Sequence, residues 1–77
     1  MDEAAVTGRV LELARRRFGR EGLAAEDDLF AALGIDSVEA LELLGLLERE
    51  LGVELPDWEL QDVRTFAELA RRVAARL

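Results

Sequence analysis

The stretch DSVEALELLGLLERELG, residues 36–52, decides the fold class. Its apolar side chains recur at steps of three and four, which is the spacing of one face of an α-helix. Asp36 is a favoured helix cap and Gly52 a typical helix end. We therefore predict a helix from Ser37 to about Leu51. Its expected core stripe is Val38, Leu41, Leu44, Leu47 and Leu51.

The same spacing predicts helices before and after this stretch. One covers residues 3–18, a short one covers residues 58–62, and a last one begins at the capping box formed by Thr65 and Glu68. No stretch alternates apolar and polar residues as a strand would, so we predict an all-α bundle of three main helices plus a short third helix. The other side chains expected to face inward are Val6, Val10, Leu13, Ala14, Phe18, Trp58, Leu60, Phe66, Leu69, Ala70, Val73 and Leu77.

The connection over residues 19–36 is long for so small a chain. Such loops are usually functional or pinned by their own side chains. Apolar residues within it favour pinning, with a short helical turn near residues 28–32. The expected anchors are Leu23, Leu29, Phe30, Leu33 and Ile35.

Length and composition limit what the chain can do. Its 77 residues suit a single domain over residues 1–77. Cysteine and histidine are absent, which excludes a disulfide and a thiolate metal site. Tyrosine, lysine and asparagine are absent too, so we predict a protein that is not an enzyme and that has no metal site.

No apolar stretch approaches the about 20 residues that span a bilayer. The N-terminus lacks the basic and apolar regions of a signal peptide. We therefore expect a soluble cytoplasmic protein, and the start at Met1 suggests a free-standing one.

Charge is distributed unevenly about a net value of −7. Residues 1–20 carry three acids and five arginines, residues 63–77 one acid and four arginines, and residues 21–62 thirteen acids and Arg49 alone. The middle of the chain should repel nucleic acid and attract basic partner surfaces. We also expect its carboxylates to repel one another, so that salt or divalent cations raise the melting temperature.

Ser37 is the only serine. If Asp36 caps the helix, with Glu39 completing an acidic capping box, Ser37 becomes the first helical residue and its hydroxyl is free to face solvent. An anion attached there would lie at the positive end of the helix dipole. An Asp-Ser pair before a helix is, taken alone, also compatible with simple capping.

Residues 28–43, which contain Gly34-Ile35-Asp36-Ser37-Val38, and residues 53–66, which contain Leu55-Pro56-Asp57, resemble acyl carrier proteins. The resemblance spans roughly residues 23–75 and implies a four-helix acyl-carrier-type bundle. It also implies that a phosphopantetheinyl transferase attaches 4′-phosphopantetheine from coenzyme A to Ser37. The thiol of that arm would hold acyl groups as thioesters.

The resemblance further implies partners and a docking surface. Asp36 would orient the loop and help bind the metal-assisted transferase, or act only as a cap. Partners would be acyltransferases, ketosynthases or acyl and aminoacyl ligases with basic docking patches, and we expect no nucleic acid, no membrane and a monomer. The expected partner-facing residues are Val38, Glu39, Glu42 and Glu48.

Three further features of the predicted helices carry expectations about packing and exposure. Gly45 interrupts the helix, so we expect close packing against a neighbour or a partner to compensate. Leu43 and Leu46 lie off the expected core stripe. They could line a cavity for an acyl chain, contact a partner or widen the apolar face, and we favour the last. The arginines of the last helix are expected to point to solvent; they are Arg71, Arg72 and Arg76.

The pathway has more than one candidate. The aspartate before Ser37 favours carriers of fatty-acid or polyketide-type biosynthesis. Stand-alone aminoacyl, peptidyl or D-alanyl carriers can also contain an Asp-Ser pair. An unmodified carrier-like interaction module is a third possibility, although it would have no need for an intact Asp36-Ser37.

Overall fold

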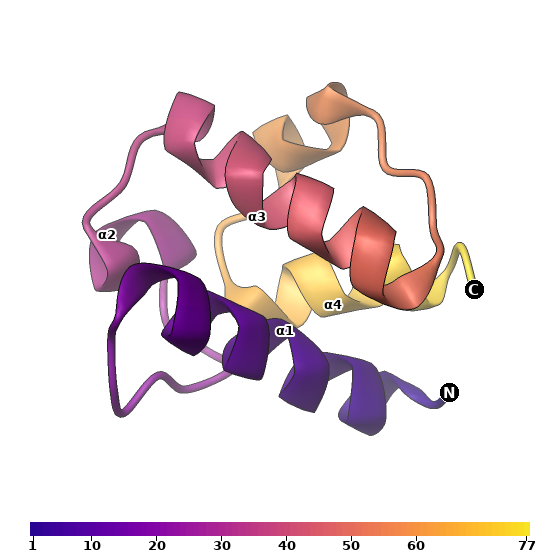
Figure 1. The fold of residues 1–77 in the computed structure, drawn as a ribbon, viewed down its shortest axis with the longest axis horizontal. Coiled ribbons are helices and arrows are strands. Elements are labelled where there is room, and N and C mark those ends of the chain that lie inside the picture. Colours follow the sequence, from indigo (N-terminus) through magenta and orange to yellow (C-terminus); the bar gives the residue numbers. More distant parts are fainter.

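The computed structural model describes residues 1–77 and contains only helices. Figure 1 shows α3 lying across α1 and α4, with both chain ends at the same end of the molecule. The all-α prediction is confirmed, and no helix is long and apolar enough to cross a membrane. The elements in chain order are α1 (Glu3–Phe18), α2 (Leu29–Leu33), α3 (Ser37–Leu51), η1, a 3₁₀ helix (Asp57–Asp62), and α4 (Phe66–Ala74).

Local capping explains where these helices begin. The Asp2, Asp28, Asp36 and Thr65 side chains each accept hydrogen bonds from free amides of the first turn that follows. The predicted boundaries of α1 and α3 are therefore correct, and the predicted turn at 28–32 is displaced from α2 by one residue.

The core is one cluster of buried apolar side chains that draws on every helix. Phe66 belongs to this cluster and has no exposed surface. Helices α1 and α4 lie side by side and both contribute to the cluster. Phe18 is half-buried at its edge. Leu77 was expected to face inward, which is wrong: it follows the end of α4 and is 52 % exposed. The buried residues of α1 and α4 are Val6, Val10, Leu13, Ala14, Phe66, Leu69, Ala70 and Val73.

The buried face of α3 differs from the predicted stripe. Val38 is 71 % exposed, whereas Leu43 is fully buried. Nine residues of α-helix make two and a half turns, so three successive steps of three place Val38 and Leu47 on opposite sides. The face that packs against the core consists of Ala40, Leu43, Leu44 and Leu47, while Leu41 and Leu51 are half-buried.

The long loop between α1 and α3 is pinned, as predicted. Leu29 and Leu33 of α2 are buried. The amide of Leu29 donates to the carbonyl of Arg64 (2.7 Å), and that of Ala67 donates to Ala25 (2.8 Å). The loop is thus tied to the start of α4 and holds the chain in place where it enters α3.

Glu59 of η1 is the one buried charged residue. Its two carboxylate oxygens accept hydrogen bonds from Arg72 and Arg76 of α4, each at 2.7 Å. The expectation that the arginines of α4 point to solvent is therefore correct only in part: Arg71 and Arg76 are exposed and Arg72 is half-buried, and Arg72 and Arg76 are held by Glu59. Trp58, expected to pack beside Leu60, is instead 54 % exposed. Because Glu59 points inward to reach the two arginines, its neighbour Trp58 points outward.

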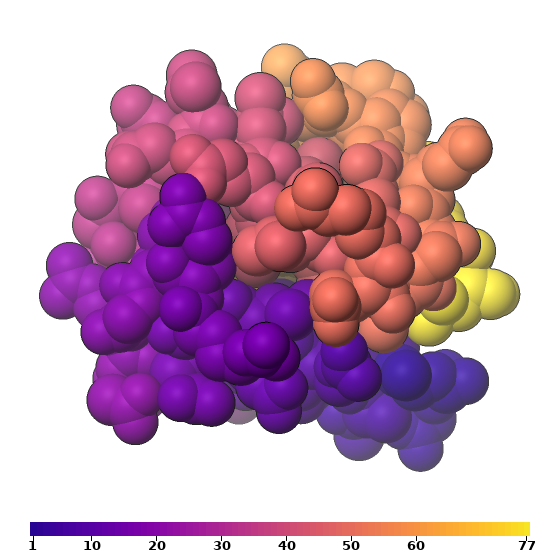
Figure 2. Space-filling model, in the orientation of Figure 1, coloured from indigo at the N-terminus to yellow at the C-terminus, as the bar shows by residue number.

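Ion pairs join the acidic middle of the chain to arginines at its ends. Arg17 pairs with Glu42, and Arg9 of α1 pairs with Glu50 at 3.1 Å. Figure 2 shows α1 and α3 meeting on one face of the molecule. The other pairs between the acidic middle and the ends are Arg15–Glu21, Arg64–Asp28, Arg72–Glu59, Arg72–Asp62 and Arg76–Glu59. Six of the thirteen acids in residues 21–62 are thus paired with arginines, and the expected rise of the melting temperature with salt stays a prediction.

Candidate functional site

The start of α3 is built by three consecutive local signals. Gly34 ends α2 in the left-handed conformation (φ 67°), which a side chain would strain. Ile35 is half-buried and anchors the turn. Asp36 then caps α3: its Oδ1 accepts from the amide of Glu39 at 2.8 Å, and Glu39 Oε1 accepts from the amide of Asp36 at 3.2 Å. The predicted capping box is present, and Ser37 is the first helical residue.

Ser37 carries the one hydroxyl that the fold leaves free. Its side chain is exposed and makes no hydrogen bond within the protein. The only other hydroxyls belong to Thr7 and Thr65. Thr7 donates to the carbonyl of Glu3 (2.8 Å), and Thr65 accepts from the amide of Glu68 (3.0 Å). Ser37 is therefore the one residue whose hydroxyl makes no hydrogen bond within the protein.

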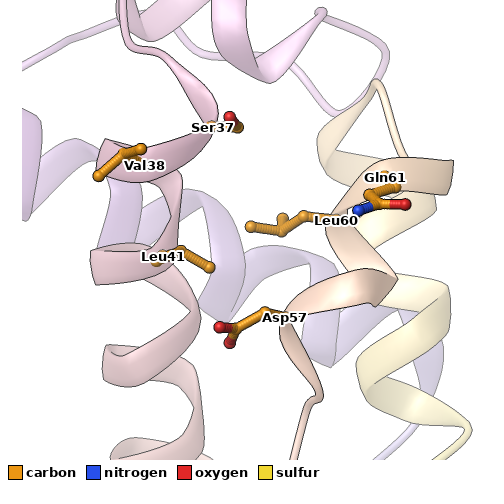
Figure 3. Close-up of a pocket in the computed structure, with 6 residues that line it drawn as sticks. All are labelled: Ser37, Val38, Leu41, Asp57, Leu60 and Gln61. Atoms are coloured by element: carbon orange, nitrogen blue, oxygen red, sulfur yellow. The ribbon is translucent and has the colours of Figure 1, made fainter.

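A groove of about 220 Å³ runs beside Ser37, between α3 and η1. Figure 3 shows Leu60 and Asp57 of η1 pointing toward α3 across it. The volume lies below the about 300–1,000 Å³ typical of ligand pockets. Six residues line the groove: Ser37, Val38, Leu41, Asp57, Leu60 and Gln61.

Negative charge surrounds the hydroxyl. The exposed carboxylates of Asp36 and Glu39 lie on α3 and that of Asp57 on η1, and none of them forms an ion pair. These groups favour the approach of a cationic surface. No three acidic side chains come close enough together to hold a metal ion.

The other predicted partner-facing residues differ in how free they are. Glu42 is exposed but pairs with Arg17. Glu48 is half-buried, and its Oε2 accepts from the amide of Leu55 at 2.9 Å. Glu48 follows Ser37 by eleven residues, or about 16 Å of helix, so the structure does not bring it to the hydroxyl.

The sequence did not single out Asp57 and Gln61 as part of this site. Both come from η1, about twenty residues after Ser37, and nothing in the intervening residues indicates that η1 folds back against α3. The Leu-Pro-Asp turn was the available signal, because Pro56 immediately precedes η1.

Comparison with protein families gives one clear match. The family model described as "Phosphopantetheine attachment site" matches residues 8–73, which is most of the chain.

Individual relatives agree with this match. The chain is 32 % identical over 81 residues to the acyl carrier protein of Syntrophobacter fumaroxidans, covering 97 % of this chain and 100 % of the relative. It is 41 % identical over 63 residues to the monensin polyketide synthase acyl carrier protein of Streptomyces virginiae, covering 77 % and 72 %. The crystal structure of an acyl carrier protein from Thermotoga maritima has the same fold, with a TM-score of 0.79 at 24 % identity, covering 99 % of this chain and 91 % of that one.

Proposed function

The chain belongs to the acyl carrier protein family, whose prosthetic group is a covalently attached 4′-phosphopantetheine, and we propose that Ser37 is the residue that bears it. Members of this family are carriers and not catalysts. The observation that carries the proposal is the free, exposed hydroxyl of Ser37 at the head of α3.

The surroundings of Ser37 fit such a group. A phosphodiester at the first residue of α3 would lie near the unpaired amides and the positive end of the helix dipole. Asp36 and Glu39 hold the helix start rigid through their reciprocal hydrogen bonds. When attached, the arm supplies the thiol that holds an acyl group as a thioester. That explains why the chain itself needs no nucleophile of this kind.

Carriers of this family meet a phosphopantetheinyl transferase and biosynthetic enzymes. We propose that these partners dock on α3 through Val38, Glu39, Glu42 and Glu48, using basic patches. Exposure of Val38 and Glu39 supports this, since both lie beside Ser37. Opposite charges chiefly raise association rates, which suits a protein that visits several enzymes. Asp36 would also help bind the metal-assisted transferase.

We propose that the pathway is fatty-acid or polyketide-type biosynthesis. The name of the Streptomyces virginiae relative supports the polyketide type, and the Syntrophobacter relative bears the general family name. The cytoplasmic location and the monomeric state stay predictions from the sequence.

Intact-protein mass spectrometry tests the proposed site. The purified chain is incubated with coenzyme A and a broad-specificity phosphopantetheinyl transferase. We expect the mass of one arm to be added to the wild type and none to Ser37→Ala. Addition of an arm to Ser37→Ala, or none to the wild type, would contradict the proposal; the second result is what an unmodified interaction module would give.

Loading assays then test the pathway. Malonyl, fatty acyl and aminoacyl donors are supplied, each with a matching loading enzyme, to the arm-bearing protein. We expect malonyl or fatty acyl groups to be accepted. Loading of amino acids alone would favour the aminoacyl, peptidyl or D-alanyl alternative.

A further inference from the structure

Gly45 lies in the middle of α3 without a structural reason to be glycine. Its backbone is not in the left-handed region, since only four other glycines have positive φ. A Cβ built on it would have no atom within 4 Å. Glycine within a helix is nonetheless destabilising relative to alanine. Packing against a neighbour, one of the two compensations expected from the sequence, is therefore absent.

A hollow of about 380 Å³ opens over this glycine, between the end of α1 and α3. The volume lies at the lower end of the range found for ligand sites. Because Gly45 has no side chain, its own backbone forms part of the hollow's surface, beside the half-buried Leu46. The remaining lining residues are Arg17, Glu42, Glu48 and Arg49.

Arg49 is the charged group on the rim that the fold leaves unused. Eight of the ten arginines make an ion pair, and only Arg20 and Arg49 do not. On the same rim Glu42 is paired with Arg17, and Glu48 accepts from the amide of Leu55. The available charge is therefore the cation of Arg49, four residues and about one turn beyond Gly45.

We propose that Gly45 and Arg49 form a receptor for partner enzymes that insert one large apolar side chain into the hollow and place a carboxylate against Arg49. This inference rests on the proposed function. Gly45 follows Ser37 by eight residues, or about 12 Å of helix. A protein–protein interface of standard size buries about 800 Å² on each partner, which is wide enough to include both Ser37 and Gly45. Such partners thus need one acidic group opposite Arg49, in addition to the basic groups that face the acidic side chains of α3.

Two synthetic helical peptides test the inference. The first presents a phenylalanine and a glutamate four residues apart, and the second has lysine in place of the glutamate. Each is titrated into the full chain while NMR follows the Gly45 amide and the Arg49 Nε–H. We expect the glutamate peptide to bind about tenfold more tightly than the lysine peptide, the size of one strong interface contact.

Variants locate the binding. Gly45→Leu fills the hollow and Arg49→Glu reverses its charge, so each should weaken the glutamate peptide about tenfold. Arg49→Glu should also come to prefer the lysine peptide. Gly8→Ala is the matched control, because Gly8 is likewise a helical glycine with open space around it. It should bind both peptides as the wild type does.

Several results would overturn the inference. These are equal binding of the two peptides, no shift at Gly45 or Arg49, or unchanged binding by Gly45→Leu. Self-association of the wild type that Gly45→Leu abolishes would assign the hollow to a second copy instead. Arm transfer to Ser37 is measured in parallel on the wild-type chain, which should accept one arm. A chain that accepts the arm but fails the peptide test refutes only this inference.

Discussion

At the residue scale, two hydroxyls are held in hydrogen bonds and one is not. Thr7 donates back to a carbonyl within α1 and Thr65 caps α4, whereas Ser37 could have been a cap but Asp36 takes that role. This division of labour leaves the serine oxygen available without weakening α3. It depends on Asp36, which makes the capping residue important for both stability and modification.

Substitutions at Asp36 separate those two roles. Asp36→Ala removes the cap and should lower the free energy of unfolding by about 1 kcal/mol, whereas asparagine caps as well as aspartate. If the charge also helps to bind the transferase, Asp36→Asn should keep its stability yet lose about tenfold in kcat/KM of arm transfer, the worth of one hydrogen bond to a charged group. Urea denaturation and a transferase assay measure the two effects. Wild-type transfer by Asp36→Asn would mean that Asp36 only caps.

At the element scale, the ends of the helices were predictable and their buried faces only in part. Caps such as Asp36 and Thr65 act within three residues, so their signals are local and readable. The buried face of α3 depends on where α1 and η1 pack, and the predicted stripe placed Val38 inside. Glu59 of η1 binds Arg72 and Arg76 of α4. Hydrophobic periodicity predicts which residues share a face of one helix, but it does not predict an ion pair between two helices.

Two glycines bounding the second half of α3 should respond oppositely to alanine. Gly45→Ala should raise the free energy of unfolding by about 0.5–1 kcal/mol, because its Cβ meets nothing. Gly52 adopts φ 69° at the helix end, a left-handed conformation that a side chain disfavours. Gly52→Ala should therefore lower the free energy of unfolding by about 1 kcal/mol. Thermal and urea denaturation measure both. Destabilisation by Gly45→Ala would show that the fold needs this glycine.

The Glu59 contact holds η1, one wall of the groove beside Ser37. The hydrogen bond from Arg72 is the main reason why the pKa of Glu59 lies below its usual range. Two backbone amides, those of Arg64 and Thr65, lower the pKa of Glu68 in the same way. In acid the folded protein therefore binds fewer protons than the unfolded chain. This stability is complete above the ordinary pKa of about 4.3 and is lost as pH falls through the lowered values.

Glu59→Gln tests this pH dependence. At pH 7 we expect the substitution to lower the free energy of unfolding by about 1–2 kcal/mol. This range already includes a discount, because the two arginines are partly exposed to solvent. As the pH falls through the lowered pKa of Glu59, wild type and variant should converge, because the wild-type carboxylate then loses its charge. Urea denaturation at a series of decreasing pH values measures this, with the exposed Asp57→Asn as control. A difference that stays undiminished at every acidic pH at which the protein remains folded would contradict the assignment.

At the scale of the whole molecule, one hydrophobic cluster links all the helices, which supports the proposal of a single domain. Ion pairs between terminal arginines and central acids cover its surface. Composition predicted the separation of charge along the chain. It could not predict this pairing, because only the folded arrangement of α1 against α3 brings Arg17 to Glu42. Of the nine acids that form no ion pair, Asp36, Glu39 and Asp57 lie near Ser37.

This pairing limits the effect of salt. Raising sodium chloride from about 0.1 to 1 M shortens the screening length from about 10 to 3 Å, which weakens both repulsion and attraction. The net charge of −7 leaves some repulsion to relieve. We expect the melting temperature to rise by no more than about 6 °C, which corresponds to about 1 kcal/mol in a chain of this size. A much larger rise, measured calorimetrically in sodium or magnesium chloride, would show that repulsion dominates.

The central claim is that the hydroxyl of Ser37 alone receives the arm. Fragment-ion mass spectrometry of the modified wild-type protein tests it most directly, because each of the three hydroxyl residues lies in a different part of the chain. We predict that every fragment containing Ser37 carries the added mass and that fragments containing only Thr7 or Thr65 do not. Added mass on either threonine, or on no fragment, would contradict the account.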